Sequence, residues 1–223
     1  SPHKNWIGIL HSGVGEPESP LLNRLEKLFT SDKWNKFKSS CKAIVVFTES
    51  QKLFLNENLR LEVTVLKLPL IIPDTDTRWS LSSYQQKSLK RVIYAGASDR
   101  CLKSFLNIEV PEKIAKVLIR HTDLDYWQDL ISTETTGIDI QTVNLTVLPF
   151  AEQEMFKEFK ESEIFYLNYK ALGNSSTLAE LVASGTPFFI NRSKDTIELL
   201  GADYPLFYNE DTSLQFSFSD EEI

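Results

Sequence analysis

The sequence predicts a protein of the α/β class with two units, each built on a mainly parallel sheet. Short apolar runs of strand length recur along the chain, and segments with helical periodicity separate most of them. Strands that alternate with helices in this way are typical of βαβ units. The stretch Pro69–Trp79, with two prolines and an acidic turn, interrupts the alternation and predicts a linker. We therefore expect one unit in residues 1–72 and a second in residues 73–223.

The N-terminal unit is expected to be incomplete, because only about three strands precede the linker. Helical segments separate these strands, and the one that follows the second strand carries apolar residues at helical spacing. The predicted strands are Trp6–Leu10, Ala43–Thr48 and Leu61–Leu68, with helical segments at Leu21–Phe29 and Glu49–Leu59.

The C-terminal unit shows the same pattern more clearly and has enough strands for a full doubly wound sheet. The continuous apolar character of "VIYAG" and "PFFIN" fits strands that are covered on both faces. Six strands are predicted, at Arg91–Gly96, Ala115–His121, Ile140–Pro149, Glu163–Tyr169, Thr186–Asn191 and Tyr204–Asn209.

Composition and charge narrow the classes of function. The chain has 42% hydrophobic and 25% charged residues, which is typical of a soluble globular protein. No apolar run approaches the roughly 18–20 residues of a membrane helix. The net charge of −7 argues against general nucleic-acid binding. Cys41 and Cys101 lie far apart without metal-binding spacing, so we expect free thiols in a reducing, cytoplasmic compartment and no metal site.

The stretch "YAGASDRCLK" is the first candidate binding segment, because it follows a predicted strand at the edge where α/β sheets bind ligands. Gly96, with Ala97 and Ser98, lets the backbone approach a ligand, and Arg100 and Lys103 supply positive charge. Arginine can hold phosphate oxygens in a bidentate fork, so a diphosphate is the natural partner. The alternative is a turn with two solvated cations at a helix start.

The stretch "ALGNSSTLAELVASGTPFFINR" is the second candidate, because it reads as a capped helix that runs into a buried strand. Asn174 or Ser175 can cap the helix and leave backbone N–H groups free at its start. Glu180 lies off the apolar stripe, so its carboxylate can accept hydrogen bonds from two vicinal hydroxyls, such as those of a ribose. The alternative is a solvated glutamate on an ordinary helix. The stripe consists of Leu178, Leu181 and Val182.

The segment "STLAELVASGTPFFINR" resembles the nucleotide-binding segment of GT-B glycosyltransferases, which carries the pattern E-A-hydrophobic-A-S-G-hydrophobic-P after a ligand-binding turn. The likeness extends to "GASDRCLKSF", to "AIVVFTESQKLFL" and to "LKLPLIIPD" between the two units, and in order these cover most of the chain. The resemblance implies a GT-B enzyme related to the large retaining family that transfers hexoses from nucleotide sugars. It implies two Rossmann-like units, of which the second binds the nucleotide sugar.

The resemblance also implies roles for individual residues. Glu180 matches the second glutamate of the family's paired-glutamate pattern, which holds the nucleotide ribose. Arg100 and Lys103 fall near the basic pair that neutralises the leaving diphosphate. His11 lies where related enzymes carry a histidine that faces the transferred sugar, although a polar residue at a strand end is the alternative. The turn whose backbone would meet the sugar or the phosphates consists of Asn174, Ser175 and Ser176.

Two departures from the family pattern favour a second hypothesis, a binding or assembly module that has lost transfer activity. The first glutamate of the pair is replaced by Leu172, at the position implied to contact the transferred sugar. The unit before the linker is shorter than the family's acceptor domain. The chain also starts without an initiator Met, so we expect a fragment, and a longer natural chain would instead favour the enzyme. An uncovered sheet edge in this unit would favour a homo-oligomer.

The expected partners follow from the same resemblance. They are a nucleotide sugar as donor substrate and a glycan or another molecule as acceptor, with no nucleic acid and no transmembrane segment. Peripheral membrane contact through surface patches stays open. No cofactor is expected, because GT-B enzymes generally need no bound metal.

Overall fold

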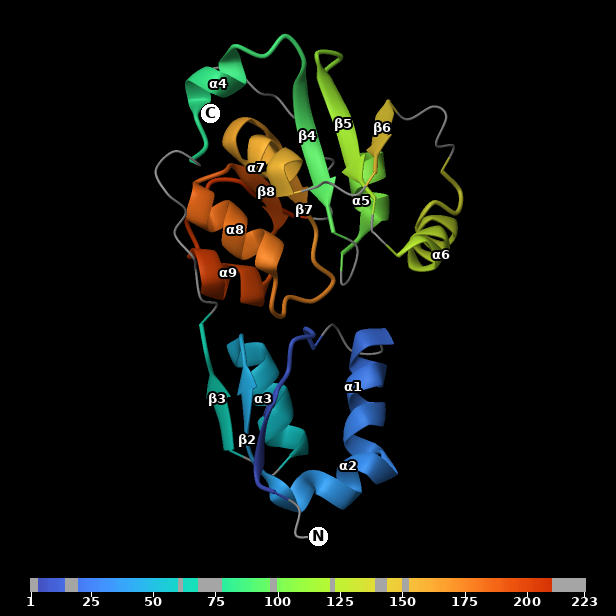
Figure 1. The fold of residues 1–223 in the computed structure, drawn as a ribbon, viewed down its shortest axis with the longest axis vertical. Coiled ribbons are helices and arrows are strands. Elements are labelled where there is room, and N and C mark those ends of the chain that lie inside the picture. The colour runs from blue at the N-terminus through green and yellow to red at the C-terminus, as the bar shows by residue number, and fades with distance from the viewer. Residues whose placement is uncertain are drawn as a thin grey trace. The chain divides into compact units, whose positions relative to one another are not determined.

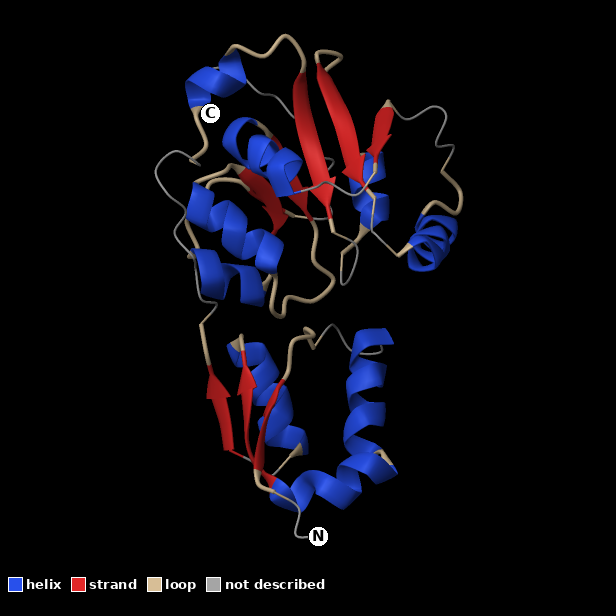
Figure 2. Cartoon of the chain, viewed as in Figure 1, coloured by secondary structure: helices blue, strands red, loops and turns tan. Residues whose placement is uncertain are grey.

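The computed structural model describes residues 4–14, 20–59, 62–67, 78–96, 100–120, 123–138, 144–149 and 153–209. The chain forms two compact units, in which helices alternate with strands along the sequence (Figure 1 and Figure 2). Unit 1 contains Ser1–Pro69, Lys170–Ser175 and Ser193–Tyr204, and unit 2 contains Leu70–Tyr169, Ser176–Arg192 and Pro205–Ile223. The boundary expected at residue 72 lies outside the described residues and stays a prediction.

Unit 1 is built on a parallel sheet of three strands in the order β1-β2-β3. Its strands are β1 (Trp6–Ile9), β2 (Cys41–Val46) and β3 (Glu62–Val65). Its helices are α1 (Pro20–Thr30), α2 (Asp32–Phe37), the 3-10 turn η1 (Lys38–Ser40), α3 (Glu49–Asn58) and α9 (Lys194–Leu200).

The core of unit 1 lies between one face of this sheet and the helices α1, α2 and α3. Among the described side chains, these helices contribute the buried apolar residues Leu25, Trp34 and Leu55 to the core. They pack in one cluster with Ile44 and Val46, which are two residues apart on β2 and therefore point to the same face. The N-terminus of α3 is completed from α9, because the backbone N–H of Glu49 donates to Glu198 at 3.0 Å.

Unit 2 is built on a parallel sheet of six strands in the order β6-β5-β4-β7-β8-β9. From β4 the chain moves outward through β5 to β6, and then returns to the other side of β4 for β7, β8 and β9. The strand order therefore reverses between β4 and β7, the kind of position where open α/β sheets bind ligands. The strands are β4 (Lys90–Ala95), β5 (Ile114–Ile119), β6 (Leu145–Leu148), β7 (Ile164–Leu167), β8 (Phe188–Asn191) and β9 (Phe207–Tyr208).

Helices cover both faces of this sheet (Figure 1). On one face α5 packs against the central strands, with the ring of Phe105 5.1 Å from Tyr94 and 5.6 Å from Tyr166. On the other face α7 packs through Phe156, whose ring meets that of Phe165 at 5.7 Å. The helices of unit 2 are α4 (Leu81–Gln85), α5 (Leu102–Asn107), α6 (Leu124–Glu134), α7 (Gln153–Ser162) and α8 (Ser176–Ser184).

A buried ion cluster joins β4 and β7 at the amino end of the sheet. The Glu163 carboxylate is fully buried, and it accepts hydrogen bonds from Lys87 Nζ and from the backbone N–H of Arg91 at 3.1 Å. The Arg91 guanidinium lies 3.3 Å from the same carboxylate. Burial raises the pKa of Glu163, while Lys87 and Arg91 act in the opposite direction. The cluster therefore fixes the two strands that border the switch point.

The expected α/β class with two mainly parallel sheets is confirmed. Each of the nine strands expected from the sequence has a counterpart among the described residues. Some of the expected ends, at Leu61, Leu68, His121 and Ile140, lie outside the described residues. Three helices were not expected, namely α2, α4 and α9. Each has seven residues or fewer, which is too short to show a helical period.

Candidate functional site

The carboxyl edge of β4 holds a buried arginine at the switch point of unit 2. Arg100 is 5% exposed, and its Nη2 donates to Tyr169 Oη at 3.0 Å, while its guanidinium lies 4.9 Å from the Tyr169 ring centroid. The other terminal nitrogen, Nη1, is buried without a hydrogen-bond partner in the described part of the chain. Gly96 permits this packing: it has a φ of +87°, and a Cβ there would lie 2.7 Å from Arg100 Nη1.

Two more buried polar atoms on the central strands lack partners within the described residues. They are Tyr94 Oη on β4 and Asn168 Oδ1 directly after β7. Burial raises the pKa of the Tyr94 hydroxyl far above its usual value, although the charge of Arg100 acts against this rise. The side-chain nitrogen of Asn168 donates a hydrogen bond to Ser104 Oγ at 2.9 Å. Buried polar groups are almost always hydrogen-bonded. Three buried polar atoms without a hydrogen-bond partner near this switch point, on Arg100, Tyr94 and Asn168, therefore indicate a polar ligand or water.

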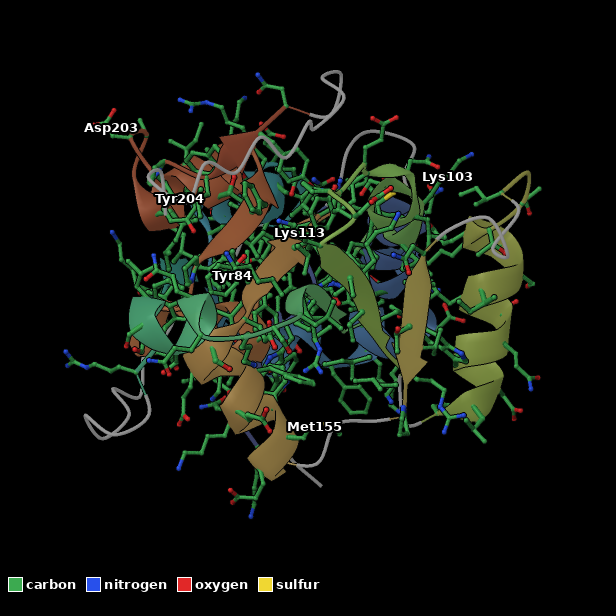
Figure 3. The ribbon with its side chains drawn as sticks, turned by 90° about the horizontal axis from the view of Figure 1, so that it is seen from above. Tyr84, Lys103, Lys113, Met155, Asp203 and Tyr204 are labelled. Carbon is green, nitrogen blue, oxygen red and sulfur yellow. The ribbon has the colours of Figure 1, made fainter. Side chains whose placement is uncertain are left out.

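Lys103, which was expected to act with Arg100 as a second cation, lies in a different environment. Lys103 is exposed on α5 (Figure 3), and its backbone N–H donates to Glu134 Oε2 at 3.3 Å. The thiol of Cys101 contacts the same carboxylate oxygen at 3.8 Å. An internal carboxylate thus already lies at the N-terminus of α5, while Arg100 is buried and Lys103 faces solvent. Ala97 and Ser98 lie outside the described residues.

Sequence reasoning missed two further arginines at the carboxyl edge of this sheet. Arg120 directly follows β5, is half-buried, and has an Nε with no hydrogen-bond partner among the described residues. Arg192 directly follows β8, and its guanidinium lies 5.2 Å from the Phe207 ring centroid. The signal was present in "AKVLIRH" and "PFFINR", where an arginine ends an apolar run. In a chain of net charge −7, cations gathered at a ligand-binding edge point to an anionic ligand.

Glu180 lies on the outer side of α8, off the packed stripe, as expected. Leu178 and Leu181 are fully buried, whereas the Glu180 side chain is 48% exposed. Its Oε2 lies 2.7 Å from Lys160 Nζ on α7. The carboxylate is therefore accessible but ion-paired, and its expected contact with a ribose stays a prediction.

In unit 1 the structure brings two of the expected residues together, His11 and Asn174. His11 is exposed near the carboxyl end of β1, and its carbonyl accepts from the Asn174 N–H at 2.8 Å. The Asn174 side-chain nitrogen lies 3.0 Å from His11 Nδ1. An amide nitrogen can only donate, so Nδ1 is the acceptor and the ring proton is on Nε2. Asn174 thus uses its side-chain nitrogen on His11, and the cap of α8 expected from Asn174 or Ser175 stays a prediction.

Two glycines allow this close approach of the two loops. A Cβ on Gly173 would lie 2.1 Å from the carbonyl oxygen of His11, and one on Gly13 would lie 2.6 Å from the Ala171 backbone. Such distances are far below van der Waals contact. Glycine is therefore required at both positions for the loops to pack in this way.

A buried glutamine that sequence reasoning did not single out holds the His11 turn. Gln51 is fully buried, and its Nε2 donates to the carbonyls of Ser12 at 2.7 Å and of Leu10 at 3.4 Å. Its Oε1 accepts from the N–H groups of Phe47 at 2.7 Å and of Thr48 at 3.0 Å. Thr48 and Gln51 form a capping box at the start of α3, and their spacing in "TESQ" was the available signal.

The remaining expected positions divide between surface and core. Ser176 is exposed at the first residue of α8, and Ser175 before it is half-buried. Leu172, at the position where the family pattern has its first glutamate, is 3% exposed and belongs to the core. Cys41 and Cys101 are free cysteines. The described residues contain no cluster of His, Cys, Asp or Glu that is able to hold a metal ion.

No helix among the described residues combines the length and the apolar character that a membrane crossing requires.

No family model matches the chain, and no curated protein matches it. Several solved structures, however, are similar to the chain. The chain is similar to Anabaena HepE in complex with UDP-glucose, with a TM-score of 0.65 at 13% identity, over 94% of this chain and 59% of that one.

Two further solved glycosyltransferases show the same similarity. WaaG, a glycosyltransferase involved in lipopolysaccharide biosynthesis, matches with a TM-score of 0.56 at 11% identity, over 99% of this chain and 67% of that one. The pneumococcal O-GlcNAc transferase GtfA, in complex with UDP and GlcNAc, matches with a TM-score of 0.55 at 10% identity, over 98% and 43%. This chain therefore spans only part of the length of its solved neighbours, and it has the two-unit fold of the GT-B glycosyltransferases.

Proposed function

We propose that this protein is a glycosyltransferase that moves a hexose from a nucleoside-diphosphate sugar to a glycan or another acceptor. The observation that carries the proposal is the buried Arg100, which packs on Gly96 at the switch point of unit 2 and has an open Nη1. A cation that has no acid partner among the described residues fits a phosphate-bearing ligand. HepE, which shares the fold, was solved with UDP-glucose, and this supports a nucleotide sugar as donor.

The chemistry of transfer explains why such a cation is needed. The leaving diphosphate gains negative charge as the bond to the sugar breaks, so cations and N–H groups already in position stabilise the transition state. Arg100, Lys103 and the first N–H groups of α8, near Ser176, would do this. Glu180 would accept hydrogen bonds from the ribose, and binding remote from the reacting carbon would position the sugar.

Unit 1 would contact the transferred sugar or the acceptor through His11. The Asn174 side chain fixes the imidazole with its proton on Nε2, so this nitrogen would be the donor that faces the substrate. The turn of Asn174 and Ser175 would meet the sugar or the phosphates. No metal and no cofactor enters this scheme, and the proposed location is cytoplasmic.

The second candidate is a binding or assembly module that keeps the nucleotide site without transferring sugar. Leu172 favours it, because a buried leucine at 3% exposure has no group to contact the transferred sugar. In this alternative the nucleotide sugar would still bind through Arg100 and Glu180, and an edge of the unit 1 sheet would mediate self-association.

Calorimetric titration with UDP, GDP and ADP and their hexose conjugates tests both candidates. We expect saturable binding of one base, weakened about 10-fold or more in Glu180→Ala, because a charge-assisted hydrogen bond contributes about 1.5–3 kcal/mol. Glu158→Ala is the matched control, since Glu158 is exposed on the neighbouring α7, and it should bind like the wild type. Absence of binding to every nucleotide, in a folded sample, would overturn the proposal. Slow release of the hexose from the bound conjugate would separate the enzyme from the module.

A further inference from the structure

The residues that follow β7 hold both the backbone and the side chain of Arg100. Arg100 and Tyr169 form an isolated antiparallel bridge, and the next N–H, of Cys101, donates to the Asn168 carbonyl at 3.0 Å. At the same place Arg100 Nη2 donates to Tyr169 Oη at 3.0 Å. The position of Arg100 is therefore set by a residue that lies 69 positions later in the sequence.

The contact with Tyr169 determines which nitrogen of the Arg100 guanidinium stays open. Tyr169 Oη takes Nη2, and the Tyr169 ring centroid lies 4.9 Å from Cζ. A Cβ on Gly96 would lie 2.7 Å from Nη1 and 3.3 Å from Nη2, so Nη1 is the terminal nitrogen nearer to Gly96. Nη1 is also the one without a hydrogen-bond partner in the described part of the chain. Tyr169 thus leaves the open nitrogen beside Gly96, at the end of β4.

A guanidinium that is held in this way is ordered before any ligand arrives. A free arginine side chain samples many rotamers, and ordering it on binding costs free energy. Arg100 is only 5% exposed, and it already has one hydrogen bond and one ring contact to Tyr169. The cost of ordering this side chain therefore falls on folding and not on binding.

Asn191, the last residue of β8, holds Tyr169 in turn. Its Oδ1 accepts from the Tyr169 N–H at 2.8 Å, and its Nδ2 donates to the Tyr169 carbonyl at 2.9 Å. The backbone pairing of β7 with β8 ends at Leu167 and Ile190. Beyond that point the Asn191 side chain satisfies both backbone groups of Tyr169, as a further strand residue would do.

This clamp lies where the chain passes out of unit 2. One stretch of unit 2 ends at Tyr169 and another at Arg192, the residue after Asn191. Both Tyr169 and Asn191 are buried, at 7% and 5% exposure. The clamp therefore keeps Tyr169 with the sheet of unit 2, although the next residue, Lys170, already belongs to unit 1.

We infer that Tyr169 is a positioning residue, which holds Arg100 with Nη1 open beside Gly96, and that Asn191 holds Tyr169 for this purpose. The inference rests on the proposed function only for the ligand that Nη1 would meet. A contact that only stabilised unit 2 would behave differently, because its removal would lower stability without a specific effect on Arg100.

Tyr169→Phe keeps the ring and removes the hydroxyl that accepts from Arg100. Tyr208→Phe is the matched control, because Tyr208 is equally buried and its Oη donates to the Leu167 carbonyl at 3.1 Å. Both variants lose one buried hydrogen bond, so we expect similar falls in melting temperature. Calorimetric titration uses whichever of UDP, GDP and ADP the wild type binds, with the corresponding nucleoside as reference. Only Tyr169→Phe should bind the nucleotide more weakly, by about 10-fold, since a hydrogen bond that orients a charged group is lost. The nucleoside should bind both variants like the wild type.

A double-mutant cycle shows whether Tyr169 acts through Arg100. Arg100→Gln should weaken nucleotide binding about 10-fold or more. In the Arg100→Gln background, Tyr169→Phe should weaken it by less than about a further 2-fold, because the group that Tyr169 holds is absent. Independent, additive losses would overturn the inference.

A second measurement needs no ligand. Phenylglyoxal modifies arginine side chains, and peptide mass spectrometry gives the rate at Arg100. Tyr169→Phe and Asn191→Ala should raise this rate above that of the wild type, whereas Tyr208→Phe should not. An unchanged rate in Tyr169→Phe would overturn the inference, and so would an equal rise in Tyr208→Phe.

The two measurements separate this inference from the proposed function. Absence of binding of every nucleotide, together with faster labelling of Arg100 in Tyr169→Phe, would refute the proposed function and leave the positioning role standing. Nucleotide binding that Tyr169→Phe does not weaken would refute the positioning role alone. Circular dichroism checks that each variant is folded, and Tyr169→Phe gives the answer if Asn191→Ala does not fold.

Discussion

Replacement of Gln51 by leucine, which has a similar size, tests whether this buried amide holds the His11 turn. The substitution removes a donor to the Ser12 and Leu10 carbonyls and an acceptor for the Phe47 and Thr48 N–H groups. The Leu10 contact, at 3.4 Å, is the weakest of the four. The other three bonds contribute about 1 kcal/mol each, so we expect a loss of about 3 kcal/mol in the free energy of unfolding.

A loss of this size should be visible in both global and local measurements. In a domain of 60–100 residues, 3 kcal/mol corresponds to a fall in melting temperature of more than about 10 °C. Urea unfolding followed by circular dichroism gives the free energy, and hydrogen exchange with mass spectrometry locates the change. Faster exchange should appear in Leu10–Gly13 and at the start of α3.

Asn56→Leu is the control, because Asn56 is an exposed amide on the same helix and should change stability by less than about 0.5 kcal/mol. The reasoning is refuted if Gln51→Leu unfolds within about 0.5 kcal/mol of the control, the size of an ordinary surface effect. It is also refuted if exchange accelerates uniformly and not in the His11 turn. Either result would mean that the turn is held by other contacts.

Two further substitutions test the packing that supports the site. Lys87→Met should cost about 3–5 kcal/mol at pH 8, because it leaves the buried Glu163 with only Arg91. Burial raises the pKa of Glu163, so the folded state binds its proton more tightly than the unfolded state. Stability from this group is present below the ordinary carboxyl pKa and is lost as the pH rises through the folded pKa. Lys87 lowers the pKa of Glu163, so its removal raises that pKa further and favours the protonated, uncharged carboxyl as the pH falls. The loss should therefore be smaller at pH 5 than at pH 8. Equal losses in urea unfolding at both pH values would contradict this, with Lys113→Met as the exposed control. Gly173→Ala should cost about 1–3 kcal/mol and break the His11–Asn174 contact, because its Cβ meets a backbone oxygen. Long-range ¹H–¹⁵N NMR should then show a mixture of His11 tautomers, whereas an unchanged spectrum, as expected for the control Ser176→Ala, would show that the loops tolerate a side chain.

The fold was accessible from the sequence because its signals are local. Apolar runs such as "VIYAG" and "PFFIN" mark buried strands without reference to distant residues. The short helix α4 was not predicted, because five residues are too few to show a helical period of apolar residues. Helix α9 carries a capping box at Ser193 and Thr196, a local signal for a helix start directly after the strand that ends at Asn191.

The candidate site was accessible only in part, because it depends on which strand ends are neighbours. Arg100 stood out beside a glycine in one continuous stretch of sequence. Arg120 lies twenty residues later, directly after β5, and only the pairing of β4 with β5 brings the ends of these two strands together. The ion pair of Glu180 with Lys160 likewise joins two helices whose packing no local pattern reveals.

The way the chain is divided between the units has a consequence for folding during synthesis. Unit 1 takes Ser193–Tyr204 from a part of the chain that emerges after most of unit 2. Until then α3 lacks the Glu198 carboxylate at its first N–H group, and His11 lacks Asn174 until residue 174 has been made. Domains usually fold in order from the N-terminus as they leave the ribosome. Here the first unit to be translated is completed only after most of the second has been made, so its maturation waits for the synthesis of the second.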